Sequence, residues 1–167
     1  KQYTIFIQKT KQNFCLNSIK IFNNLAINLL NRNKSLLLIG ASQKEEDEFT
    51  QKWIDQNNEW LLLFVYFCKT IYFYLVKNYN SAFENGIKAE KYKNAAAAYL
   101  TKPQHNFYSS LCFIAHYHNC TIEQQKQILE RVEKNQQDMK IWAGHCPENF
   151  QHKYDLVEAE KARVLRS

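Results

Sequence analysis

Soft metal ligands gather in the second half of the chain. Cys112, His116 and Cys120 follow one another at intervals of four residues, with His118 close by. An α-helix turns once in 3.6 residues, so this spacing would place the three side chains along one helical face, where zinc could bind them. A structural zinc site usually draws its ligands from two elements, however, and Cys112 lies in the apolar run Leu111–Ile114, where a buried thiol is ordinary packing. We therefore predict no bound metal, and keep Cys112, His116 and Cys120 as the ligands of an alternative hypothesis.

His145, Cys146 and His152 flank a predicted turn between two helices and could add further ligands. Helix capping and packing explain these residues equally well. A Cys–His pair acting as nucleophile and base would need an orienting group and an oxyanion site, and the sequence identifies neither. The three glycines stand alone, which excludes a phosphate-binding loop and a dinucleotide fingerprint in these residues. We predict no catalytic residue and no cofactor.

Composition favours one helical domain. The chain has 167 residues, only three glycines and two prolines, and 14% aromatic residues. The net charge of +6 is spread along the chain without a nucleic-acid-binding motif, so we predict no nucleic-acid partner. Five cysteines without regular spacing favour reduced thiols and a cytoplasmic location. The chain begins at Lys1 without a signal-peptide pattern, and we expect it to be a segment of a longer protein.

The segment Trp60–Val76 is apolar on every side except at Lys69 and Thr70. Such a helix must be enclosed by other helices or by lipid. Its 17 residues are at the lower limit for crossing a bilayer, and Lys69 would cost about 2.5–3.5 kcal/mol there. We therefore predict no membrane span but a central buried helix, whose Lys69 carries its ammonium to the edge of the array.

The first 57 residues are predicted to form the leading part of the array. Lys1–Lys9 fits either a short strand or a lead-in to the first helix. Phe14–Asn31 is predicted to be an amphipathic helix whose inward stripe comprises Cys15, Ile19, Phe22, Leu25, Ala26, Leu29 and Leu30. Leu36–Ile39 fits a loop laid across a helical core better than a strand. The acidic run Glu45–Glu48 fits either the start of a helix reaching Asn57, with Phe49 and Trp53 inward, or a solvated loop.

Four further helices are predicted after the central one. The first begins with Asn80 as its N-cap and reaches Ala98, and the second covers Asn106–Tyr117. The third begins at the capping box Thr121–Gln124, buries Trp142 among its apolar stripe, and ends with Gly144 as its C-cap. The last begins at Pro147.

Two motifs carry a resemblance to known families. Tyr79-x-x-Ala82 and Ala89, after an aromatic helix, resemble the second helix of a tetratricopeptide repeat, with Thr70 and Gly86 departing from its pattern. A longer motif follows in the C-terminal part: Phe107-Tyr108-Ser109-Ser110-Leu111, Val132-x-x-Asn135-Gln136-x-x-Met139-Lys140-x-Trp142-Ala143, His145-x-Pro147-x-Asn149-Phe150-x-His152-Lys153, and Leu156-Val157-Glu158-Ala159-Glu160-x-Ala162-Arg163-Val164. This motif resembles the helical-repeat region of the large hybrid signalling kinases common in cyanobacteria. Cys146 and Glu148 depart from its pattern, and no catalytic residue is carried over.

The resemblance implies an all-α fold in which antiparallel helix pairs stack as a tetratricopeptide-like α-solenoid. Residues 1–57 would supply the leading helices and connecting loop, and residues 58–167 the helix pairs, in one continuous domain. In that family, serine/threonine kinase, AAA-type ATPase, GAF and histidine kinase domains accompany such helices. The implied function is a non-catalytic segment for protein–protein interaction and coupling between domains. The alternative is a free-standing helical protein that binds a metal or another ligand through Cys112, His116 and Cys120.

Overall fold

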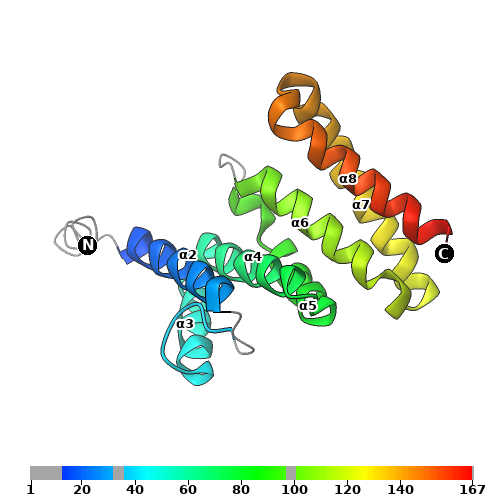
Figure 1. Cartoon of the computed structure of the whole chain (residues 1–167). Coiled ribbons are helices and arrows are strands. Elements are labelled where there is room, and N and C mark those ends of the chain that lie inside the picture. The colour runs from blue at the N-terminus through cyan, green and yellow to red at the C-terminus, as the bar shows by residue number, and fades with distance from the viewer. Residues whose placement is uncertain (1–12, 32–35, 97–100, 167) are drawn as a thin grey trace.

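The described part of the chain is entirely helical. The computed structural model describes residues 13–31, 36–96 and 101–166, so the expectation for Lys1–Lys9 lies outside it. The described residues contain no strand and form seven α-helices and two short 3-10 helices: α2 (Asn13–Asn31), α3 (Gln43–Asp55), α4 (Glu59–Leu75), α5 (Tyr79–Glu90), η1 (Lys93–Ala96), α6 (Thr101–His116), η2 (Tyr117–Asn119), α7 (Ile122–His145) and α8 (Pro147–Arg166). Figure 1 shows α2 to α5 on one side of the molecule and α6 to α8 on the other.

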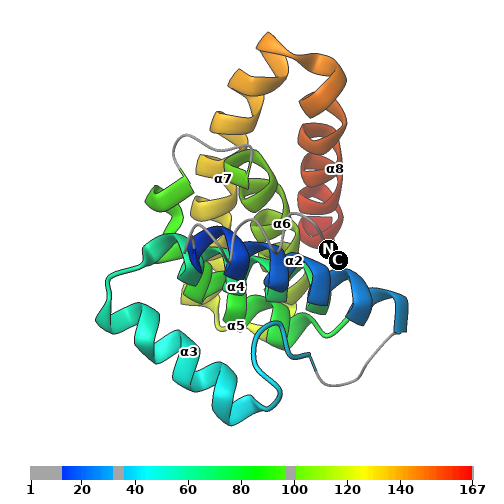
Figure 2. The same ribbon diagram turned by 90° about the vertical axis from the view of Figure 1, so that its left-hand side faces the viewer.

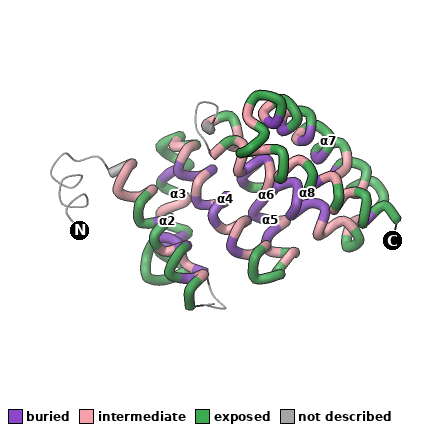
Figure 3. The backbone as a smooth tube through the Cα atoms, turned by 45° about the horizontal axis from the view of Figure 1, so that its top comes forward, coloured by how far each residue is buried: buried purple, intermediate pink, exposed green. Residues whose placement is uncertain are grey.

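The helix α4 is the central element, as the sequence predicted. It begins after the N-cap Asn58 and buries side chains along its whole length, from Leu61 to Tyr72. It contacts α2 and α3 on one side and α5 and α6 on the other. Figure 3 shows its buried residues in the middle of the array, with exposed residues on the outer helices. No described helix has the length and apolar character needed to span a membrane.

Two apolar clusters meet along α4. The first joins α4 to Ile21 and Leu25 of α2, to the loop before α3 and to Trp53 of α3. The second is formed by α5, α6, α7 and α8, around Phe113, Val132 and Val157. Phe73 of α4 packs against both clusters. After α4, helices that follow one another in the sequence also lie in contact. The helix α5 contacts α6, α6 contacts α7, and α7 forms a hairpin with α8 (Figure 2).

The loop before α3 lies across the core, as predicted. Leu36, Leu38 and Ile39 are buried in the first cluster without forming a strand. Side chains satisfy the loop's backbone: the Asn24 amide donates to the Leu38 carbonyl at 3.0 Å, and the Asn28 amide donates to the Leu37 carbonyl at 3.3 Å. These bonds replace the backbone partners that a sheet would supply, which is why the segment can be buried as a loop.

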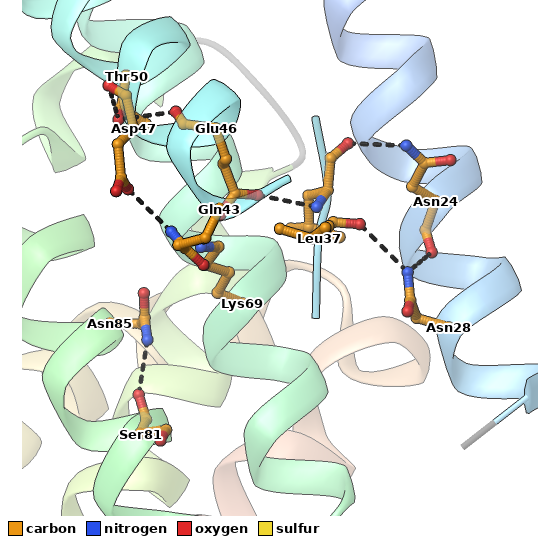
Figure 4. A network of polar contacts seen from close by, with 11 residues as sticks. Asn24, Asn28, Leu37, Gln43, Glu46, Asp47, Thr50, Lys69, Ser81 and Asn85 are labelled. Atoms are coloured by element: carbon orange, nitrogen blue, oxygen red, sulfur yellow. Dashed lines mark hydrogen bonds and ion pairs between the residues drawn. The ribbon is translucent and has the colours of Figure 1, made fainter. Parts of the chain in front are cut away.

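The acidic run forms a helix, and the alternative of a solvated loop was wrong. Ser42 caps α3 by accepting a bond from the Glu45 backbone amide at 3.2 Å. Glu46 is only 1% exposed; it forms an ion pair with Lys69 of α4 and accepts a hydrogen bond from the Leu38 amide at 2.8 Å (Figure 4). The Lys69 side chain is 14% exposed, so its ammonium is partly buried, and Glu46 is the partner that the sequence did not identify.

Four helix boundaries differ from the prediction. The N-cap of α5 is Asn78 instead of Asn80, and the helix stops at Glu90, well short of the alanine run, whose Ala97 and Ala98 lie outside the described residues. The helix α6 begins at Thr101, with a proline in its first turn, where a missing amide hydrogen is tolerated. The C-cap of α7 is Cys146 instead of Gly144.

Two expected features of α7 and α8 are confirmed and one is corrected. Thr121 forms the predicted capping box with Gln124, and α8 begins at Pro147. Trp142, which was expected in the core, is only half-buried. Its ring lies 6.2 Å from that of Phe150 in α8 and under the ammonium of Lys102 in α6 at 5.7 Å, so contacts with these two helices cover part of it.

Candidate interaction surface

The predicted row of soft ligands does not form one helical face. Cys112 and His116 belong to α6, but the helix ends at His116, and Cys120 follows the 3-10 turn η2. The spacing argument assumed one continuous helix and failed at this break. Among the residues that the structure describes, no group of three or more His, Cys, Asp or Glu side chains could hold a metal ion.

Each member of the row has a packing role. Cys112 is fully buried in the second cluster, and burial raises the pKa of its thiol well above its usual value. The ring of His116 stacks on that of Phe83 at 4.4 Å; burial lowers the pKa of His116, and Glu84 raises it by a smaller amount. The Cys120 thiol donates to the His116 carbonyl at 3.6 Å, and burial raises its pKa. None of these thiols is poised as a thiolate ligand or nucleophile.

In the second group of His and Cys residues, Cys146 caps a helix. Cys146 ends α7, and its sulfur accepts a hydrogen bond from the Asn149 amide at 3.0 Å. His152 is exposed on α8, with the Lys153 ammonium 3.1 Å from its ring nitrogen. Capping, one of the two explanations that the sequence left open, accounts for Cys146.

The clearest candidate for function is an exposed apolar face of α2. The inward residues of this helix are Ile21, Leu25 and Asn28. The expected inward stripe was therefore only partly right. Leu25 is buried in the core and Leu29 packs against it, but Ile19, Phe22 and Leu30 are 43%, 62% and 83% exposed. Together with the exposed Ala26, they lie at steps of three and four residues along one side of the helix, which we call the α2 face.

The α2 face is almost uncharged. Of the 19 residues in α2, only Lys20 carries a formal charge, and Asn side chains supply most of the remaining polarity. A surface helix normally carries charged residues opposite its buried stripe. Apolar and aromatic residues without charges are instead typical of the centre of a protein–protein interface.

Sequence reasoning missed this face for a specific reason. Apolar residues occur on both sides of α2, so the three- and four-residue spacing fits either side equally well. The signal that distinguishes the sides is polar: Asn24 and Asn28 bond the carbonyls of the buried loop and so face the core. An Asn pair four residues apart beside an apolar run could have been used as this signal.

Comparison with known proteins gives no match. No protein-family model, no curated protein and no solved structure is detectably similar to this chain.

Proposed function

We propose that this chain is a non-catalytic helical-repeat segment of a cytoplasmic multidomain signalling kinase, and that it binds another protein segment through the α2 face. The observation that carries the interaction role is the uncharged, apolar and exposed character of Ile19, Phe22 and Leu30. The assignment to a signalling kinase rests on the motif between residues 106 and 164, which resembles the repeat region of hybrid kinases with an ATPase module.

The order of helix contacts supports stacking as tetratricopeptide-like pairs. α4 contacts α5 and α6, α6 contacts α7 and α8, and each hairpin is joined by a short turn. If α4–α5 and α6–α7 are successive pairs, the first helices of neighbouring units lie against one another, as stacking in a solenoid requires. The buried Ala82 and Ala89 allow α5 to pack closely on α6 and α4, respectively.

The occupant of the α2 face would be an amphipathic helix, from another domain of the parent protein or from a separate one. The opposite side of α2 already packs on a helix, α4, so a second helix on the α2 face would extend the same layer of helices. An apolar stripe spaced at three and four residues fits the apolar side of a helix better than an extended peptide. A partner with a strongly charged surface is disfavoured because Lys20 offers the only complementary charge on α2.

The reading frame beyond Lys1 and Ser167 tests the kinase assignment. We expect kinase and ATPase domains in the same frame, and no ATP hydrolysis or phosphotransfer by the 167-residue segment alone. A frame without any such domain, or phosphotransfer by the segment, would contradict the assignment.

Charge substitution tests the coupling role in the parent protein. We expect Phe22→Asp to reduce signal-dependent phosphorylation at least tenfold, because a carboxylate cannot be buried unpaired in the apolar contact. Ile141→Asp is the matched control, since Ile141 is 58% exposed on α7, away from the α2 face. Circular dichroism should show the same helix content in both variants. Equal phosphorylation in wild type and Phe22→Asp would overturn the coupling role.

A further inference from the structure

The helix α6 joins the two sides of the molecule. It contacts α4, α5 and η1 on one side and α7 and α8 on the other, and Figure 1 shows it between these two groups. His105 and His116 of α6 are about three helical turns apart, so they lie on the same side of the helix. The ring centroid of His105 lies 5.9 Å from that of Phe67 in α4, and the centroid of His116 lies 4.4 Å from that of Phe83 in α5. We call the contact of α6 with α4, α5 and η1 the α6 junction, and it has a histidine towards each end.

The surroundings of His105 favour a neutral imidazole. The residue is only 6% exposed, and its Nε2 lies 3.3 Å from the hydroxyl oxygen of Ser109, an uncharged partner. Burial has the largest effect on the pKa of His105 and lowers it. Glu90 of α5 raises this pKa by a smaller amount, and Lys93 of η1, which forms an ion pair with Glu90, lowers it. The remaining charged groups that line the same small cavity as His105 come from α6 and α7, and they are Lys102, Lys134 and Asp138.

The surroundings of His116 have the same effect at the other end of the junction. Its Nδ1 is buried and has no hydrogen-bond partner among the described residues. A protonated imidazole has two N–H donors, so protonation would leave a donor without an acceptor at this position. Burial lowers the pKa of His116, and Glu84 of α5 raises it by a smaller amount. The neighbouring titratable groups are the thiols of Cys112 and Cys120, whose pKa values burial raises, so neither supplies a negative charge.

These pKa directions set the sign of the pH dependence. A histidine whose pKa is lower in the folded protein than in the unfolded chain stabilises the fold fully above its unfolded pKa of about 6.5. This contribution is lost as the pH falls through the lower, folded pKa. Because both imidazoles lie on the same side of α6, both positive charges would arise in the contact with α4 and α5.

Each side of the molecule has apolar contacts that do not depend on the α6 junction. The first cluster holds α2, the loop before α3, α3 and α4 together. Most of the buried side chains in the second cluster come from α6, α7 and α8. We propose that the α6 junction is a pH-sensitive hinge, in which protonation of His105 and His116 loosens α6, α7 and α8 from α4 and α5. This device goes beyond the interaction role of the α2 face and does not rest on it.

Two buried thiols report opening of the hinge in the full 167-residue chain. Cys112 is fully buried and faces α5, since its sulfur lies 3.6 Å from the position that a Cβ at Gly86 would take. Cys68 is equally buried, but it lies in the first cluster. Dithiodipyridine forms a mixed disulfide with an accessible thiol and releases thiopyridone, and mass spectrometry identifies the labelled cysteine. Labelling rates are divided by those of the urea-unfolded chain at the same pH, which removes the pH dependence of the reagent.

We expect the normalised labelling rate of Cys112 to rise about tenfold or more between roughly pH 7.5 and pH 5.5, and that of Cys68 to change by less than about threefold. The double variant His105→Gln with His116→Gln should lose this rise, because glutamine does not titrate. The matched control His152→Gln removes an exposed imidazole outside the junction and should keep it. A constant Cys112 rate, or equal rises for both thiols, would contradict the hinge, since equal rises mean that the whole fold opens.

A measurement on the wild-type protein keeps the proposal testable if the double variant does not fold. The imidazole proton resonances of His105 and His116, followed by NMR against pH, should titrate with midpoints below the usual histidine value. Midpoints at or above that value would contradict the hinge. The phosphorylation experiment on Phe22→Asp measures the α2 face independently, so a failure of either proposal can be distinguished from a failure of the other.

Discussion

A single lysine in the central helix shows how one residue depends on a distant segment. The sequence makes clear that Lys69 interrupts an apolar helix, and elementary electrostatics requires that a buried ammonium find a partner. The sequence does not show which of the four consecutive acidic residues is the partner of Lys69. The structure selects Glu46, because the loop and α3 together place this carboxylate between the Leu38 amide and the Lys69 ammonium.

Removing one member of this pair should destabilise the fold strongly. We expect Glu46→Ala to lower the free energy of unfolding by about 3–5 kcal/mol, because it leaves the Lys69 ammonium buried without its partner. Urea denaturation followed by circular dichroism measures this change. The matched control is Glu48→Ala, which removes an exposed carboxylate from the same helix and should cost less than about 0.5 kcal/mol.

The double variant tests whether the charge itself causes the loss. Replacing both residues, as Glu46→Ala with Lys69→Met, should recover part of the stability lost in the single variant, because no unpaired charge then remains buried. Additive losses in the double variant would mean that the two side chains are not coupled, which would contradict the ion pair.

At the level of elements, helix starts that carry a strong local signal were predicted correctly, whereas other helix boundaries and the faces were not. The Thr121 capping box and Pro147 fix the starts of α7 and α8 through local chemistry, and the structure confirms both. The end of α5 and the start of α6 carry no such local signal, and the composition of the alanine run was misleading there. The apolar spacing of α2 fits both of its sides, and only the pair Asn24 and Asn28, which bonds the buried loop, indicates which side faces the core.

Two helical glycines differ in their surroundings and give a paired prediction. A Cβ at Gly144, near the end of α7, would meet nothing within 4 Å, whereas a Cβ at Gly86 would lie 3.3 Å from the Phe113 ring. We expect Gly144→Ala to raise the free energy of unfolding by up to about 1 kcal/mol through helix propensity. Gly86→Ala should raise the free energy of unfolding less, or lower it, because crowding against the Phe113 ring opposes the gain from helix propensity.

Thermal denaturation of the two variants measures this difference. The melting temperature of Gly144→Ala should be several degrees higher than that of Gly86→Ala. The buried Gly86 also stands where the tetratricopeptide pattern prefers an aromatic residue. A higher melting temperature for Gly86→Ala than for Gly144→Ala would show that α5 and α6 do not pack closely at this position.

At the scale of the whole molecule, α4 organises a helical array that is left open along one side. The sequence identified the central helix and the all-α class, because uniform apolarity and helical spacing are strong signals. It could not show that the array presents α2 at its edge, with an uncharged apolar face turned away from α4 (Figure 1). The proposed interaction role rests on this arrangement.

Photo-crosslinking in the parent protein, in its own cell, tests this account most directly. A photoreactive phenylalanine analogue replaces Phe22, and in a separate variant it replaces the similarly exposed Ile141 of α7. We predict that position 22 crosslinks to one defined peptide whose apolar residues are spaced at three and four residues, and that position 141 gives no crosslink to that peptide. If position 22 yields no defined crosslink, or if both positions yield the same products, the α2 face is not a docking surface for a helix.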